Sequence, residues 1–258
     1  MTRLEELVLR TLAIVLVPVV AGLSLYVQIL WKQKEDSSNQ NNSYVSPYNL
    51  YEFMDYVKDG TTVLTCAGST GSGFVFNLSA DPESDHATWR FELPKENYST
   101  VLTNYHVVEN CIEEGSSVTV ELSDGISIKG EILGVDEKND VAVIGIAKEA
   151  EGLFAANWNL DSGNWVMAAG SPLGLNSTVT FGHIINLDGN RIYTSASLNR
   201  GNSGGPLVEN AGFVIGINTG YKAVAQNINW GVSINVLCDS LANCMNPKHG
   251  LIYPIVWE

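Results

Sequence analysis

The chain contains a serine, a histidine and an aspartate whose settings suit acyl transfer. Ser203 lies in a glycine-rich stretch, His106 follows an apolar run, and Asp140 opens another apolar run. A serine hydroxyl needs a base, which a neutral imidazole supplies, and a carboxylate holds that imidazole in the useful tautomer. The order histidine, aspartate, serine is a known order of the hydrolytic triad. We therefore predict His106 as base, Asp140 as orienting group and Ser203 as nucleophile.

The glycines around the serine have a second predicted role. They let the backbone turn so that the amide N–H groups of Gly201 and Ser203 converge on one point. Two such donors would bind the oxyanion that develops on an attacked carbonyl. We predict an oxyanion hole formed by these two amides.

The same stretch also fits the G-x-S-x-G elbow of α/β-hydrolases, which is a different fold. That elbow joins a strand to a helix and orders its partners as serine, acid, histidine. The matching esterase would use Ser203, Asp239 and His249. The apolar runs at 206–208 and 213–217, separated by a turn at 210–212, instead indicate strand, turn, strand.

Composition narrows the class of partner. The chain has 258 residues, a formal net charge of −14 and only 16% charged residues. An acidic chain disfavours nucleic acid as a partner, because binding there depends on neutralising phosphates. No metal-ligand cluster or phosphate-binding loop stands out, so we expect neither a cofactor nor a metal.

The N-terminal part differs from the rest of the chain. After a flank at residues 1–10, residues 11–31 are uncharged and mostly apolar. As a helix they would span about 30 Å, the thickness of the hydrocarbon core. We predict a membrane-spanning signal-anchor, with a cleaved signal peptide as the alternative. Polar residues 32–47 read as a flexible linker to a catalytic domain at 48–258.

The four cysteines bear on the compartment. Cys66 and Cys111 would tie the histidine segment to a neighbouring strand, and Cys238 and Cys244 could pair if the helix between them ends near Asn243. The alternative is four buried thiols. Because disulfides imply an oxidising compartment, we expect a single-pass membrane protein whose catalytic domain lies outside the cytoplasm.

The remaining pattern is that of an all-β chain. A short helix is predicted at 48–57, and a closing helix at 233–243. Between them lie two sets of about six short strands. The first set is predicted at 62–66, 73–77, 99–104, 118–122, 126–135 and 140–146. The second is predicted at 165–169, 178–187, 191–195, 205–208, 213–218 and 231–234. The first set carries the histidine and the aspartate, the second carries the serine, and the site would lie between them.

The chain resembles the trypsin-fold serine peptidases, and among them the HtrA-like, Deg-type branch. The stretches that carry the resemblance are 71–74, 102–108, 135–143, 170–175, 198–207 and 214–219. The resemblance implies two six-stranded antiparallel β-barrels, endopeptidase activity on polypeptides, and the triad named above. The family usually carries PDZ domains after the catalytic part, and we expect none here.

By analogy with the family, one group of residues would line the primary specificity pocket: Ser197, Leu198, Thr219, Gly220 and Tyr221. No acidic residue stands at Ser197, so we expect small aliphatic residues rather than Lys or Arg before the cleaved bond. Asn202 precedes the serine where many digestive relatives have an aspartate, so activation by an ion pair to a new N-terminus is not expected. The alternative to a peptidase is a catalytically silent binding or chaperone-like module.

Overall fold

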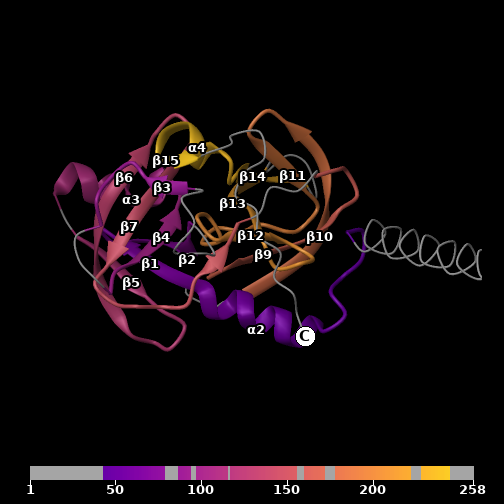
Figure 1. Cartoon of the computed structure of the whole chain (residues 1–258), viewed down its shortest axis with the longest axis horizontal. Helices are drawn as coiled ribbons and strands as arrows, with labels where there is room; N and C mark the ends of the chain where they lie inside the picture. Colours follow the sequence, from indigo (N-terminus) through magenta and orange to yellow (C-terminus); the bar gives the residue numbers. More distant parts are fainter. Residues whose placement is uncertain are drawn as a thin grey trace, which may run out of the picture. The chain divides into compact units, whose positions relative to one another are not determined.

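The computed structural model describes residues 43–78, 87–93, 97–115, 117–155, 160–171, 178–221 and 228–244. Within them the backbone forms two six-stranded antiparallel β-barrels, one after the other along the chain (Figure 1). The helices of these ranges are α2 (Leu50–Gly60), α3 (Tyr105–Glu114) and α4 (Val236–Ser240). The prediction of an all-β, two-barrel fold is confirmed.

The first barrel is closed by pairing between its first two strands, in the order β1-β5-β6-β7-β4-β2, with β8 added in parallel beside β2. Its strands are β1 (Thr61–Cys66), β2 (Ser69–Asn77), β4 (Ser99–Thr103), β5 (Val118–Glu121), β6 (Ser127–Asp136), β7 (Val141–Ile146) and β8 (Leu153–Phe154). The second barrel has the order β10-β11-β14-β13-β12-β9. Its strands are β9 (Trp165–Gly170), β10 (Thr178–Asp188), β11 (Arg191–Thr194), β12 (Pro206–Glu209), β13 (Val214–Tyr221) and β14 (Asn229–Ser233).

Alternation along two apolar strands explains how the barrels are joined. In β7, Ala142 and Ile144 enter the core of the first barrel, whereas Val141 and Val143 enter a separate cluster between the barrels. In β9, residues 166 and 168 face the core of the second barrel, and its other apolar residues face that shared cluster. Because successive side chains of a strand point to opposite faces, a strand buried on both faces is apolar throughout. The barrels therefore share one continuous apolar contact.

Two helices depart from the predicted pattern. α3, which carries His106, was not expected; it ends at Gly115, whose positive φ of 65° closes the last turn. The closing helix predicted at 233–243 is only the five-residue α4, because the chain then forms β15 (Ala242–Cys244), which pairs with β3 (Ala87–Trp89). The guanidinium of Arg90 donates to the backbone carbonyls of Cys238 and Asp239 and so caps α4.

The predicted Cys66–Cys111 disulfide is present, joining β1 to α3 with 5.5 Å between the Cα atoms. Cys238 is also in a disulfide. The predicted pairing of Cys238 with Cys244 involves the side chain of Cys244, which lies outside the described residues.

The predicted membrane helix and its flank also lie outside the described residues. In the described part of the chain, no helix has both the length and the apolar content needed to cross a bilayer. The predicted linker is described only from Ser43, whose carbonyl accepts the N–H of Trp165 at 2.8 Å. The carbonyl of Val45 accepts the side-chain amide of Asn210 at 3.1 Å. The last residues of the predicted linker thus run along the second barrel.

Candidate active site

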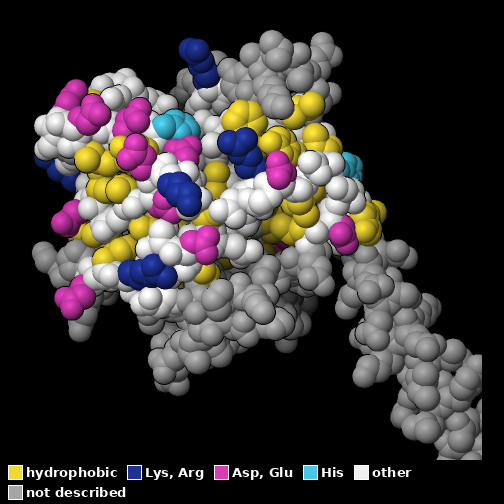
Figure 2. Space-filling view, turned by 90° about the horizontal axis from the view of Figure 1, so that it is seen from above, with side chains coloured by type: hydrophobic (Ala, Val, Ile, Leu, Met, Phe, Trp, Pro, Cys, Tyr) yellow, Lys and Arg dark blue, Asp and Glu magenta, His cyan; other side chains and the backbone are white. Residues whose placement is uncertain are grey.

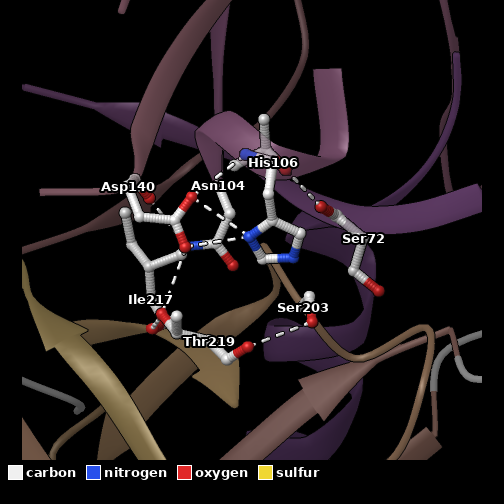
Figure 3. A network of polar contacts seen from close by, with 8 residues as sticks. Ser72, Asn104, His106, Asp140, Ser203, Ile217 and Thr219 are labelled. Carbon is white, nitrogen blue, oxygen red and sulfur yellow. Dashed lines mark hydrogen bonds and ion pairs between the residues drawn. The ribbon is translucent and has the colours of Figure 1, made fainter. Parts of the chain in front are cut away.

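The three predicted catalytic residues lie together where the two barrels meet (Figure 3). His106 is in the first turn of α3, and Asp140 is the last residue of the turn that leads into β7. Ser203 is in the loop between β11 and β12. His106 and Ser203, which are 97 positions apart in the sequence, therefore lie in one site, as expected for a site between two barrels.

His106 and Asp140 are in direct contact. Nδ1 of His106 lies 2.9 Å from Oδ2 and 3.1 Å from Oδ1 of Asp140, and the His106 backbone N–H donates to Oδ1 at 3.0 Å. This hydrogen bond to the carboxylate is the main reason that the pKa of His106 is raised above its usual 6.5; burial acts in the opposite direction. The contact leaves Nε2 as the ring nitrogen available to a proton donor.

The backbone at Asp140 is held in an uncommon conformation. Its φ is +58°, a left-handed value that aspartate tolerates better than most residues. The turn before it is fixed by Asp136, whose carboxylate accepts the backbone N–H and side-chain amide of Asn139 at 3.1 and 2.7 Å. Asn104, buried beside the site, donates its amide to the carbonyl of Asp140 at 2.8 Å and to Oγ1 of Thr219 at 3.1 Å. One amide thus links the aspartate of the first barrel to the second barrel.

Ser203 is oriented toward its own barrel. Its hydroxyl donates to the carbonyl oxygen of Thr219 in β13 at 3.2 Å. The described contacts include no hydrogen bond between Ser203 and His106. A rotation about the Cα–Cβ bond of Ser203 would redirect the hydroxyl without moving the backbone.

The loop that carries Ser203 has two free donors. Among the described residues, nothing accepts a hydrogen bond from the backbone N–H of Gly201 or of Ser203. The N–H of Asn202, between them, donates to the carbonyl of Asn199 at 3.0 Å. Gly201 has φ 99° and Gly204 has φ 87°, values that favour glycine, which explains the glycines that flank the serine.

A pocket of about 190 Å³ opens beside the serine. Its lining residues are Leu198, Asn199, Arg200, Ser203, Thr219, Gly220 and Trp230. Three of the five predicted pocket residues are among them. Ser197 is exposed and outside the lining, with its carbonyl accepting the hydroxyl of Thr180 at 2.8 Å. The side chain of Tyr221 lies outside the described residues.

Comparison with known proteins assigns the chain to a family. The pattern of the family described as "Trypsin-like peptidase domain" matches residues 71–217, more than half of the 258 residues. The chain belongs to the trypsin-like peptidases. The matched range holds all three residues predicted for the triad.

The relatives of this trypsin-like peptidase agree with the predicted Deg-type branch. "Putative serine protease HhoB" of Synechocystis sp. is 39% identical over 181 residues, covering 64% of this chain and 38% of that protein. "Probable periplasmic serine endoprotease DegP-like" of Chlamydia trachomatis is 41% identical over 133 residues, covering 46% of this chain and 25% of that protein. A crystal structure of the serine endoprotease from Yersinia pestis matches with a TM-score of 0.59 at 26% identity, over 76% of this chain and 65% of that one. The chain thus spans well under half of the curated relatives it matches.

Sequence reasoning missed two residues of the site. Asn104 lies in the stretch 102–108 that carries the resemblance but was not predicted as a site residue, and its amide reaches Asp140 and Thr219. Trp230 was not singled out, yet it pairs with Gly220 across β13 and β14 and lines the pocket. A Cβ added to Gly220 would lie 2.4 Å from Cζ2 of the Trp230 ring. A tryptophan opposite a glycine on neighbouring strands would have been the available signal.

The esterase alternative raised from the sequence finds little support in the described residues. Ser203 is followed by β12 rather than by a helix, so the α/β-hydrolase elbow is not formed. Asp239 is on the exposed part of α4, and His249 lies outside the described residues. No group of three or more His, Cys, Asp or Glu residues in the described part could hold a metal ion. Figure 2 shows acidic and basic side chains interspersed on one face rather than a basic patch.

Proposed function

We propose that this trypsin-like peptidase is a serine endopeptidase that uses His106, Asp140 and Ser203. The observation that carries the proposal is the 2.9 Å contact between His106 and Asp140 beside a serine in a loop with two free amides. A structural ion pair would explain the first part alone. It would not explain why the backbone N–H groups of Gly201 and Ser203 have no acceptor among the described residues, whereas an oxyanion would use both.

The chemistry follows from this geometry. The Ser203 hydroxyl turns from Thr219 to Nε2 of His106, and its oxygen attacks the substrate carbonyl carbon while His106 takes the proton. The carbonyl electron pair moves to the oxygen, which accepts hydrogen bonds from the amides of Gly201 and Ser203. When the carbonyl re-forms, the C–N bond breaks and His106 protonates the departing amine. Water then repeats the sequence on the acyl-enzyme, and Asp140 stabilises the protonated imidazole each time.

Polypeptide is the proposed substrate, with a small residue before the cleaved bond. The pocket beside Ser203 measures about 190 Å³ and presents Leu198 and Trp230. The guanidinium of Arg191 lies 5.9 Å from the centre of the Trp230 ring, within the range of a cation–π contact. A rigid aromatic wall in a small pocket favours short aliphatic side chains over large or basic ones.

We also propose that the enzyme acts outside the cytoplasm and is held at a membrane by residues 11–31. Two observations support the compartment: the disulfide between Cys66 and Cys111, and the word "periplasmic" in the name of the relative from Chlamydia trachomatis. The anchor rests on the apolar composition of residues 11–31. Membrane flotation of the full chain, compared with a variant carrying three lysines in that run, tests it: co-flotation of both proteins would contradict it.

One observation favours a second function, a binding module that keeps the fold without catalysis. The hydroxyl of Ser203 is occupied by the carbonyl of Thr219 rather than by His106. If this arrangement persisted with substrate bound, the serine would have no base.

Hydrolysis of an internally quenched peptide library by the full chain distinguishes the two functions. The peptidase should cut internal bonds, leave new amino and carboxyl termini detectable by mass spectrometry, and lose activity in His106→Ala. A binding module should retain peptides uncut, and the His106→Ala variant should bind them as the parent does. Cleavage that survives in His106→Ala would contradict the proposed mechanism.

A further inference from the structure

Ser72, in β2 of the first barrel, makes contacts that the triad does not require. The residue is fully buried, and its hydroxyl accepts the backbone N–H of Ser171 at 2.8 Å. The same hydroxyl donates to the carbonyl oxygen of Gly201. An amide N–H can only donate, so the single hydroxyl proton of Ser72 is directed to Gly201. One side chain of the first barrel therefore connects two segments of the second.

The backbone of Ser72 holds the same loop at a second point. Its N–H donates to the carbonyl of Ser203 at 2.9 Å, and its own carbonyl accepts the hydroxyl of Thr103 at 2.7 Å. Figure 3 shows Ser72 on the side of the His106 ring that is away from Asp140. The two residues whose amides face the proposed oxyanion, Gly201 and Ser203, are thus each held at their carbonyl oxygen by Ser72.

The hydroxyl contact matters because of where it acts. Gly201 has φ 99° and no side chain, so the peptide units on either side of it would otherwise rotate more freely than those of any other residue. The surroundings of the hydrogen bond between Ser72 and Gly201 are tightly packed. Gly170 lies beside it, and a Cβ added to Gly170 would lie 3.0 Å from Oγ of Ser72 and 2.8 Å from Cα of Asn202. The carbonyl of Gly201 belongs to the Gly201–Asn202 peptide unit, which lies between the unit that carries the Gly201 N–H and the unit that carries the Ser203 N–H. A bond at this carbonyl fixes the middle unit and so limits the rotation of the two donor units relative to each other.

We propose that Ser72 is a positioning residue for the oxyanion-binding amides, acting through the carbonyl of Gly201. The proposal rests on the peptidase function proposed above and adds a residue to it. In this role, the buried side chain of Ser72 does not touch the substrate. A loop held in the productive orientation before the reaction lowers the barrier, because no rearrangement is needed as charge develops.

The chain offers a matched control in Thr100. Its buried hydroxyl donates to the carbonyl of Phe76 at 2.7 Å, between β4 and β2, so the bond has the same chemistry inside the same barrel. Neither Thr100 nor Phe76 belongs to the candidate site. Ser72→Ala and Thr100→Val each delete one buried hydroxyl. Ser72→Ala removes two hydrogen bonds and Thr100→Val removes one, so Ser72→Ala should destabilise the fold somewhat more.

The test measures peptide hydrolysis and hydrogen exchange of the full chain with both variants. We expect Ser72→Ala to lower kcat about 10–100-fold with KM within about threefold, because a misplaced donor acts mainly on the transition state. Exchange should rise in peptides covering 199–205 in Ser72→Ala and not in Thr100→Val. A kcat within threefold of the parent and unchanged exchange would overturn the proposal, as would equal losses in the two variants.

Two further outcomes of this test bear on the proposal. If the parent does not cleave peptides, the peptidase function fails, and exchange at 199–205 alone decides whether Ser72 holds the loop. If Ser72→Ala does not fold, Ser72→Cys replaces it in both measurements, because a thiol is a weaker donor at the same position. A kcat for Ser72→Cys equal to that of the parent would then overturn the proposal.

Discussion

The two barrels contribute different residues to the site, and these residues differ in the contacts that they already make. The first barrel presents a pair already in contact, with Nδ1 of His106 2.9 Å from Asp140. The second presents Ser203 with its hydroxyl on the carbonyl of its own Thr219. Contacts within one barrel are fixed by local structure, whereas the contact between base and nucleophile crosses from one barrel to the other. In the proposed mechanism, a rotation of the Ser203 side chain in the second barrel moves its hydroxyl from Thr219 to His106.

The largest expected effect comes from removing the proposed base or the proposed nucleophile. His106→Ala and Ser203→Ala should each lower kcat by about 10⁴–10⁶-fold, and the double variant should lose no more, because the residues act as a unit. Initial rates on one peptide substrate would measure this. Losses that multiply in the double variant would mean that the barrels act independently.

Asp140→Asn tests the pair within the first barrel. We expect kcat to fall by about 10⁴-fold, since an amide favours the wrong tautomer of His106. Asp140 raises the pKa of His106, and the base must be neutral to act. Activity of the parent should therefore fall as pH drops through a value above 6.5, and in Asp140→Asn this limb should move to lower pH. A limb at the same pH in both proteins would contradict the assignment.

The disulfide between Cys66 and Cys111 belongs to the first barrel alone. It closes a loop with a sequence separation of 45 residues and ties β1 to α3, the helix of His106. Replacing both cysteines by alanine should lower the free energy of unfolding by about 4 kcal/mol. Urea unfolding followed by tryptophan fluorescence would measure the change. An unchanged midpoint would show that packing alone holds α3.

Trp230 tests specificity in the second barrel. Trp230→Ala should enlarge the pocket and shift the ratio of kcat/KM for phenylalanine over alanine before the cleaved bond by about 10–100-fold. Cleavage after alanine should change much less. Arg191→Ala, which removes the cation over the ring, serves as the comparison, and a ratio unaltered in Trp230→Ala would rule out this wall of the pocket.

The smallest effect concerns a buried carboxyl at the end of β12. Burial raises the pKa of Glu209 to about 7, although the backbone N–H groups of Ala211 and Phe213 donate to it. A folded pKa above the unfolded value contributes stability that is complete below about 4.5 and is lost as pH rises through about 7. The free energy of unfolding should fall by about 3 kcal/mol over this range. Glu209→Ala should flatten this slope, and an equal slope in that variant would exclude Glu209 as its source.

The sequence predicted the strands well and the helices less well. β7 and β9 were predicted because their apolar runs are buried on both faces, in one barrel core and in the cluster between the barrels. α3 was missed: of its ten residues, only Val108 and Cys111 are buried. α4 was predicted too long, because the pairing of β15 with β3 depends on a contact about 150 residues away in the chain.

For the site, the proposed catalytic residues could be named from the sequence, whereas the residues around them could not. His106, Asp140 and Ser203 stand in motifs whose chemistry is legible from residue type and order. Ser72 and Trp230 act through packing and hydrogen bonds between strands, and no local pattern records which carbonyl or which ring they will meet.

Fluorophosphonate labelling of the full chain tests the central claim most directly. The reagent reacts with a serine only when a base activates it. We expect one label on Ser203 in the parent and none in Ser203→Ala or His106→Ala. A folded parent, with the Cys66–Cys111 disulfide intact, that takes no label would contradict the account, as would labelling that persists in His106→Ala.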